Sequence, residues 1–179
     1  MSKINLAYKL CLFGDFGVGK TTLTHKYLYG FYDANIKYTL GAEILAKKVE
    51  IEDFSIMLQI WDFGGQQDFR FLLTSYSKGA SGGIYMYDIT KYSSLEKTDY
   101  WLNLLREGLK ENELSIPMLL VGGKLDLTEK RTFKFDEARE FGEKYGFFDC
   151  IECSAKTGEN VELIFETIVR RIMQDKGLI

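Results

Sequence analysis

The residues best suited to chemistry form one short stretch, Gly14-Asp15-Phe16-Gly17-Val18-Gly19-Lys20-Thr21, which matches the pattern G-x-x-x-x-G-K-[ST]. An apolar run over residues 10–13 precedes it, and a helical pattern over residues 20–29 follows it. In this strand–loop–helix setting, backbone N–H groups wrap a phosphate. Lys20 then supplies a mobile charge for the terminal phosphates, and the Thr21 hydroxyl is placed to bind Mg²⁺. A glycine-rich turn before an ordinary helix is the alternative, but it would not require the Lys-Thr pair.

A second motif, Trp61-Asp62-Phe63-Gly64-Gly65-Gln66, closes a strand pattern. Asp62 can hold Mg²⁺ through water beside the phosphate loop. Gly65 can offer its backbone N–H to the outermost phosphate, and Gln66 can orient an attacking water. Thr39 lies in an aperiodic segment, residues 31–42, and can close over the metal and the γ-phosphate. The pattern therefore predicts Thr21, Thr39 and Asp62 as the metal-binding set.

Two further motifs suit the recognition of a base. Gly123-Lys124-Leu125-Asp126 follows an apolar run, and Asp126 can accept hydrogen bonds from both N1–H and N2–H of guanine. Adenine offers no such pair of donors, so two bonds to a charged group give strong discrimination. The methylenes of Lys124 can lie along the base or the ribose. In Cys153-Ser154-Ala155-Lys156, the Ala155 N–H can meet the guanine carbonyl.

Strand and helix patterns alternate along the chain. Strands are expected over residues 6–13, 43–51, 54–61, 83–87, 118–121 and 147–152. Helices are expected over residues 20–29, 93–111, 136–145 and 161–172, the last with Asn160 as its cap, whereas residues 31–42 and 62–79 have no clear period. This order predicts one α/β domain over residues 1–179, with a doubly wound, six-stranded, mostly parallel sheet, one antiparallel strand and helices on both faces. Ligands of such sheets bind at the carboxyl ends of the strands, where each motif lies.

Composition narrows the class of protein. The chain has 179 residues and a net charge of −3, which argues against nucleic acid as a partner. The three cysteines are too few for a disulfide scaffold and favour a cytoplasmic location. Cys150 and Cys153 form a C-x-x-C, for which two positions on a buried strand are a better explanation than redox chemistry. No signal peptide, membrane span or standard lipidation motif is visible, so peripheral attachment to the cytosolic face of a membrane would need a further tail or anchor.

In this order and spacing, the motifs resemble those of the Ras superfamily of small GTPases across essentially the whole chain. The Ras and Rab branches are the most similar, and W-D-F-G-G-Q is also similar to Arf proteins. The resemblance implies a P-loop G domain that binds GTP or GDP with Mg²⁺, hydrolyses GTP, and acts as a molecular switch in signalling or vesicle trafficking. It implies effector contacts through residues 31–42 and 62–78, together with an exchange factor and a GTPase-activating protein as partners.

The resemblance also assigns roles to single residues. Lys20, Gly65 and Gln66 are the catalytic set it implies. The nucleotide contacts are Asp15, Phe16, Gly17, Val18, Gly19, Lys20, Thr21, Thr22, Tyr32, Thr39, Gly65, Lys124, Asp126, Ser154, Ala155 and Lys156. Among these, Tyr32 falls where the family has an aromatic side chain against the guanine edge.

Two departures from the family pattern carry expectations of their own. Gly123 stands where the family has Asn, so one or two neutral hydrogen bonds are lost and guanine binding should weaken roughly tenfold. Phe16 occupies a position that is small in most relatives, beside the γ-phosphate and Gln66. A ring there would displace Gln66 or block an arginine finger, and slow intrinsic hydrolysis is expected. Arg70 is interpreted as a surface or partner contact rather than an internal finger.

Two other functions stay open at this point. One is a non-hydrolysing GTP-binding scaffold, which Gly123 and Phe16 favour and Thr39, Asp62 and Gln66 oppose. The other is an ATP-dependent phosphotransferase, which the guanine-selective carboxylate of Asp126 opposes.

Overall fold

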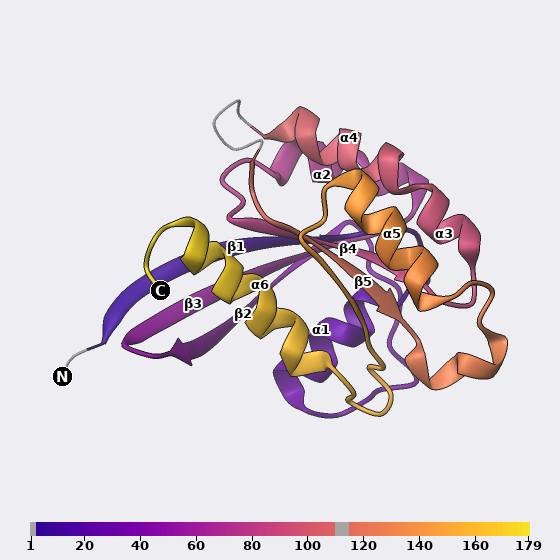
Figure 1. The fold of residues 1–179 in the computed structure, drawn as a ribbon, viewed down its shortest axis with the longest axis horizontal. Helices are drawn as coiled ribbons and strands as arrows, with labels where there is room; N and C mark the ends of the chain where they lie inside the picture. The colour runs from indigo at the N-terminus through magenta and orange to yellow at the C-terminus, as the bar shows by residue number, and fades with distance from the viewer. Residues whose placement is uncertain (1–2, 110–114) are drawn as a thin grey trace.

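The computed structural model describes residues 3–109 and 115–179. Its centre is a six-stranded sheet of order β2-β3-β1-β4-β5-β6, in which β2 runs antiparallel to β3 and every other neighbouring pair is parallel (Figure 1). The predicted fold class is therefore confirmed. The strands are β1 (Ile4–Phe13), β2 (Ala42–Ile51), β3 (Phe54–Phe63), β4 (Gly82–Asp88), β5 (Met118–Gly123) and β6 (Asp149–Glu152).

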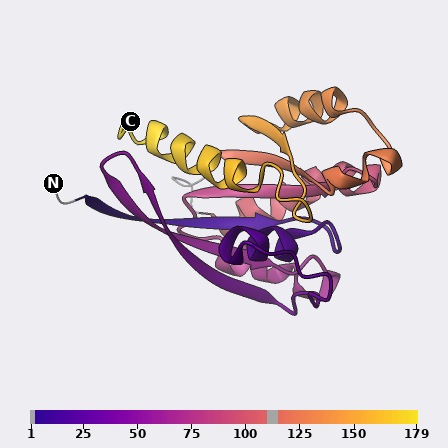
Figure 2. The same ribbon diagram turned by 90° about the horizontal axis from the view of Figure 1, so that it is seen from below.

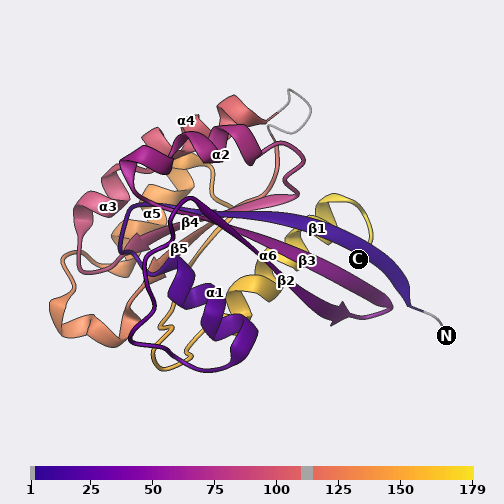
Figure 3. The same cartoon turned by 180° about the vertical axis from the view of Figure 1, so that it is seen from behind.

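Helices cover both faces of this sheet (Figures 1 and 3). They are α1 (Lys20–Tyr29), α2 (Phe71–Tyr76), α3 (Tyr92–Glu96), α4 (Thr98–Gly108), α5 (Phe135–Tyr145) and α6 (Val161–Asp175). Buried side chains of α1 and α6 share one apolar cluster, and those of the other four helices share a second cluster on the opposite face. Figure 2 shows α1 and α6 in front of the strands.

The apolar patterns explain which strands lie where. In β3, Ile56, Leu58 and Ile60 are fully buried, whereas Met57 and Gln59 between them are exposed. Every residue of β4 is buried, as is nearly every residue of β5, because helices cover both of their faces. In the sheet, β4 lies between β1 and β5, and β5 lies between β4 and β6, so both are interior strands.

Helix α6 packs on one face of the sheet. Its stripe of apolar residues is buried, and the Phe165 ring stacks on Tyr27 of α1 with centroids 3.8 Å apart and an interplanar angle of 15°. The Lys47 ammonium of β2 lies 3.6 Å from the centroid of the same Tyr27 ring. The ring pair therefore joins α1, α6 and the β2–β3 hairpin.

Three local expectations differ from the structure. Asn160 occupies the N-cap position of α6, but its side chain makes no capping hydrogen bond: its backbone is left-handed (φ 59°), and its amide donates to the Glu152 carbonyl at 2.8 Å. The single helix expected over residues 93–111 is divided at Lys97 into α3 and α4, and the Thr98 hydroxyl donates a hydrogen bond to the Leu95 carbonyl there. Residues 110 and 111 of that prediction lie outside the described residues. The aperiodic stretch 62–79 contains α2, which packs on α4.

The loops that carry the motifs all leave the carboxyl ends of parallel strands. The phosphate loop follows β1, the second motif ends β3, and the two base motifs follow β5 and β6. Within residues 3–109 and 115–179, the structure has no helix whose length and hydrophobicity would let it span a bilayer.

We expect Phe165→Ala to lower the free energy of unfolding by about 3–5 kcal/mol, because it leaves a cavity and removes a stacked ring. Guanidinium unfolding with excess GDP in every sample measures the loss. Leu163→Ala is the matched control, since Leu163 lies on the exposed side of the same helix, and a change within about 0.5 kcal/mol is expected there. Equal losses in the two variants would contradict this account of the core.

Candidate functional site

The phosphate loop is wound tightly around the end of β1. A Cβ atom at Gly14, whose φ is 142°, would lie 2.2 Å from the Met86 carbonyl oxygen, so only glycine fits there. The buried Lys20 ammonium donates to the carbonyl oxygens of Gly14 and Asp15, both at 2.9 Å. Burial lowers the pKa of Lys20 to about 8, against the opposing pull of Asp62 and Asp15. A bound anion would favour the charged ammonium.

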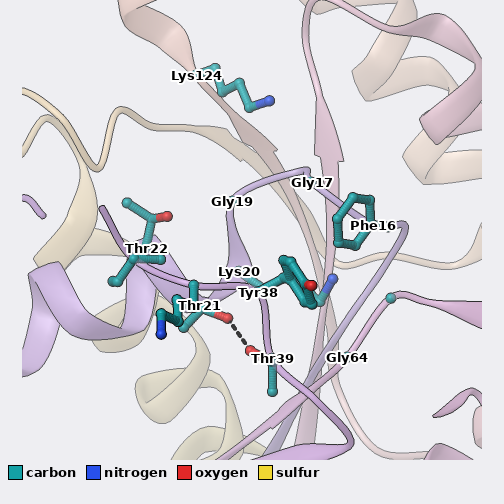
Figure 4. A pocket seen from close by; sticks show the side chains of 13 residues that line it. Phe16, Gly17, Gly19, Lys20, Thr21, Thr22, Tyr38, Thr39, Gly64 and Lys124 are labelled. Carbon is teal, nitrogen blue, oxygen red and sulfur yellow. Dashed lines mark hydrogen bonds between the residues drawn. The ribbon is translucent and has the colours of Figure 1, made fainter. Parts of the chain in front are cut away.

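Three side-chain oxygens meet beside Lys20. The Thr21 hydroxyl lies 2.5 Å from the Thr39 hydroxyl (Figure 4). It donates to Asp62 Oδ2 at 2.5 Å, and the Thr39 hydroxyl is 3.3 Å from the same oxygen. The side chain of Asp62 is fully buried, and its Oδ1 has no hydrogen-bond partner in the described structure. Burial raises the pKa of this carboxyl. Hydroxyl and carboxylate oxygens are the ligands that Mg²⁺ prefers, so this set fits the ion.

Two adjoining cavities open at this edge of the sheet. The larger has a volume of about 310 Å³ and the smaller about 140 Å³, and Gly19, Thr22 and Lys124 line both. Of the predicted residues, the larger is also lined by Phe16, Gly17, Lys20, Thr21, Thr39 and Gly65. The smaller is also lined by Val18, Tyr32, Asp126, Ala155 and Lys156. One elongated space therefore runs from the phosphate loop to the base motifs.

The carboxylate predicted to bind the base has a defined partner. Ser154 is buried, and its hydroxyl donates to Asp126 Oδ1 at 2.7 Å. Lys124 has a left-handed backbone (φ 69°), and its ammonium donates to Asp88 Oδ2 at 2.7 Å. Burial pushes the pKa of Asp88 upward, but hydrogen bonds from Lys124 and Thr90 hold it below its ordinary value. Asp88 ends β4, so the rule that ligands gather at strand ends would have found it.

Two aromatic rings stand at the mouth of the larger cavity. Phe16 and Tyr38 are 54% and 63% exposed, and their rings meet edge to face with centroids 5.9 Å apart. The predicted site includes Phe16 but not Tyr38, although Tyr38 directly precedes Thr39. An aromatic residue in an aperiodic loop has no periodic signal that would reveal it.

Glycines bring the second motif against the phosphate loop. A Cβ atom at Gly65 would lie 2.4 Å from the Phe16 backbone nitrogen, so any side chain there would separate the two segments. The Gly64 N–H donates to the Gly41 carbonyl at 2.7 Å, which joins the segments 31–42 and 62–78. Gln66 follows Gly65 in the chain and is half-buried, but it does not line the cavity.

The side chain of Asp15 serves another contact. Its carboxylate accepts from Lys97 at 2.5 Å and from Arg70 and the Trp101 indole at 3.4 Å each. Arg70 lies over the rings of Tyr100 and Trp101, with its guanidinium carbon 5.1 Å from each centroid. Arg70 is therefore not the unattached surface residue that the sequence suggested, because it is paired and stacked within the fold. Its partners are distant in sequence and give no local signal. Its contact with a partner protein stays a prediction.

The cysteines take no part in this site. Cys150 and Cys153 are free and buried, and burial raises the pKa of each thiol to about 12. This favours the packing interpretation of the C-x-x-C over a redox one.

Comparison with known proteins agrees with this geometry. A family model described as Ras family matches residues 9–174. The chain is 37% identical to Ras-related protein Rab-11A of Dictyostelium discoideum over an alignment of 165 residues. This alignment covers 92% of this chain and 75% of the relative. It is 34% identical to Ras-related protein Rab-19 of Xenopus laevis over an alignment of 166 residues. This alignment covers 93% of this chain and 76% of the relative.

These matches favour a GTP-binding switch over a non-hydrolysing scaffold or an ATP-dependent phosphotransferase. The protein binds GTP and GDP with Mg²⁺ and hydrolyses GTP. Because the family model spans most of the chain and both relatives agree with it, this chain belongs to the Ras family of small GTPases.

Proposed function

We propose that the larger cavity binds the phosphates of GTP or GDP and that the smaller one binds guanine. The observation that carries this assignment is the pairing of opposite charges along one space. A buried ammonium, Lys20, lies at one end, and a carboxylate, Asp126, lies at the other. The phosphates match the first, and the two guanine N–H donors match the second. We further propose that residues 1–179 form a single G domain.

The metal ion of the reaction is assigned to Thr21, Thr39 and Asp62. The support is the unpartnered, buried Oδ1 of Asp62 and the two hydroxyl oxygens beside its other oxygen. Mg²⁺ held there supplies positive charge that offsets the charge of the phosphates. Because Thr39 comes from segment 31–42, metal binding and the order of that segment are coupled.

We assign hydrolysis to Lys20, Gly65 and Gln66, acting on a water beside the γ-phosphate, and we propose that it is slow. Lys20 stabilises the charge that develops between the β- and γ-phosphates, and Gln66 orients the water. Two observations support a low rate. Phe16 and Tyr38 crowd the cavity mouth, and Gln66 lies outside the cavity lining.

The surfaces proposed for partners are segments 31–42 and 62–78. Leu40, Ile44, Phe71 and Tyr76 in and beside these segments are exposed, which suits effector binding. A GTPase-activating protein would have to supply its own positive charge, because Arg70 is engaged with Asp15. An exchange factor would act on the same segments, since they close the phosphate cavity.

Among the branches of the family, we propose the Rab branch, because both relatives named above are Rab proteins. The free, buried cysteines support a cytoplasmic location. Peripheral binding to the cytosolic face of a membrane would fit this branch.

We expect Asp126→Asn to weaken GDP binding at least about 100-fold, because an amide cannot accept from both guanine N–H groups. Binding of xanthosine diphosphate should improve, since xanthine presents a carbonyl to which the amide can donate. Competition against a fluorescent GDP analogue measures both affinities. Asp136→Asn, at an exposed residue of α5, is the control and should change neither. Unchanged GDP affinity in Asp126→Asn would refute the base assignment.

Removal of Mg²⁺ with excess EDTA should speed GDP release at least about tenfold, equivalent to about 1.4 kcal/mol of lost binding. In Thr21→Val, which lacks the hydroxyl but keeps the shape, release should be fast with or without EDTA. Stopped-flow release of a fluorescent nucleotide gives the rates. Thr167→Val on α6 should keep the full response to EDTA. A normal EDTA response in Thr21→Val would exclude this residue as a metal ligand.

Phe16→Gly should raise the rate of single-turnover GTP hydrolysis, by about tenfold if the ring displaces the water-orienting side chain. Phe16→Leu is the matched control, because it keeps bulk at the cavity mouth and should stay slow. Released phosphate is measured from protein loaded with GTP and Mg²⁺. An unchanged or lower rate in Phe16→Gly would show that the ring does not limit hydrolysis.

A further inference from the structure

The end of β5 lacks a side chain that could brace the base-binding loop. A Cβ atom at Gly123 would lie 2.4 Å from Met86 Cε and 2.8 Å from the Val18 carbonyl oxygen. The methionine methyl group and the phosphate loop therefore occupy the space that a side chain at position 123 would need. Support for the loop that carries Asp126 has to come from elsewhere in the fold.

The far end of that loop is held by an ion pair. Asp126 lies in a 3₁₀ segment, Leu125–Lys130, and Arg131 follows it directly. Arg131 Nη1 donates to Glu152 Oε1 at 2.8 Å, and Nη2 donates to Glu152 Oε2 at 2.5 Å. The Glu152 side chain is only 7% exposed, and the Arg131 side chain is 21% exposed. A two-point contact of this kind restricts both the distance and the orientation of the guanidinium.

Glu152 is itself fixed in place. It ends β6, its backbone carbonyl accepts the Asn160 amide at 2.8 Å, and its Oε1 accepts the Tyr87 hydroxyl at 3.3 Å. Glycine at position 122 makes room for this contact, since a Cβ atom there would lie 2.6 Å from the Tyr87 oxygen. The Arg131 guanidinium therefore docks on a rigid carboxylate.

The same strand end reaches Asp126 by a second route. Two residues beyond Glu152, the Ser154 hydroxyl donates to Asp126, and the Leu125 N–H donates to the Cys153 carbonyl at 2.9 Å. The segment Leu125–Lys130 is thus joined to the end of β6 at its beginning and, through Arg131, just beyond its end. Displacement of the Arg131 side chain would remove the contact with Glu152 at one of these two ends, where the Thr132 N–H still donates to the Ile89 carbonyl at 3.1 Å.

We propose that Arg131 and Glu152 are positioning residues for guanine recognition, which hold the loop against β6 so that the Asp126 carboxylate faces the base. They provide the support that Gly123 cannot provide. This inference rests on the proposed role of Asp126. Neither residue lines the cavities, so the pair acts through Asp126 and not on the nucleotide.

The test compares GDP with inosine diphosphate, which lacks the 2-amino group and so makes only one of the two bonds to Asp126. If Arg131 positions this carboxylate, Arg131→Gln weakens GDP binding more than binding of inosine diphosphate. We expect the ratio of the two affinities to fall by about three- to tenfold. Displacement of a fluorescent nucleotide measures both affinities in the full chain with Mg²⁺. A purely structural role would lower both equally and leave the ratio unchanged, which would overturn the proposal.

Two further variants keep the outcome decisive. Arg131→Lys retains the charge but not the two-point contact, so it should lower the ratio less than Arg131→Gln does. If Arg131→Gln does not fold, Arg131→Lys alone decides, and an unchanged ratio overturns the proposal. Arg139→Gln, which removes an exposed ion pair on α5, is the control.

Asp126→Asn separates this inference from the base assignment on which it rests. If Asp126→Asn leaves the ratio unchanged, the base assignment itself fails. If it abolishes the preference while both Arg131 variants keep it, only the positioning role fails.

Discussion

Asp62 ties together three segments that are distant in the chain. It is the penultimate residue of β3, and one of its oxygens contacts Thr21 in the first turn of α1 and Thr39 in segment 31–42. Its other oxygen is buried without a partner in the described structure, an arrangement that is costly unless a cation compensates it. The contact between these three segments thus involves a buried carboxylate whose charge calls for a partner. Through Thr39, the same carboxylate also holds segment 31–42 beside the loop.

The parts of the site that could be predicted from sequence are those whose chemistry is local. The phosphate loop needs its glycines and Lys20 within a few residues of one another, so its pattern and its structure coincide. The alternation of strand and helix patterns predicts a mostly parallel sheet, and the strand-end rule then gathers the separate motifs at one edge. Asp126 and Ala155 line one cavity for this reason, although they lie far apart in sequence.

The parts that could not be predicted depend on contacts between distant residues. Arg70 is held by Asp15 and by two rings of α4, and none of these partners is near it in the chain. Asn160 is a residue type that often caps helices with its side chain, but its side-chain amide donates instead to the backbone carbonyl of Glu152. The aromatic contact between Phe16 and Tyr38 joins two exposed loops, which carry no periodic pattern. In each case tertiary geometry overrides local preference.

Asp15 connects the phosphate loop to side chains that lie outside it. Its carboxylate holds Arg70 and Lys97, while its backbone carbonyl accepts the Lys20 ammonium. A protein that bound Arg70 and drew it away from Asp15 would remove a positive charge from beside this carboxylate. Asp15 is also the residue whose backbone carbonyl accepts a hydrogen bond from Lys20. One residue thus connects side chains of segment 62–78 and of the region around α4 to the buried ammonium of Lys20.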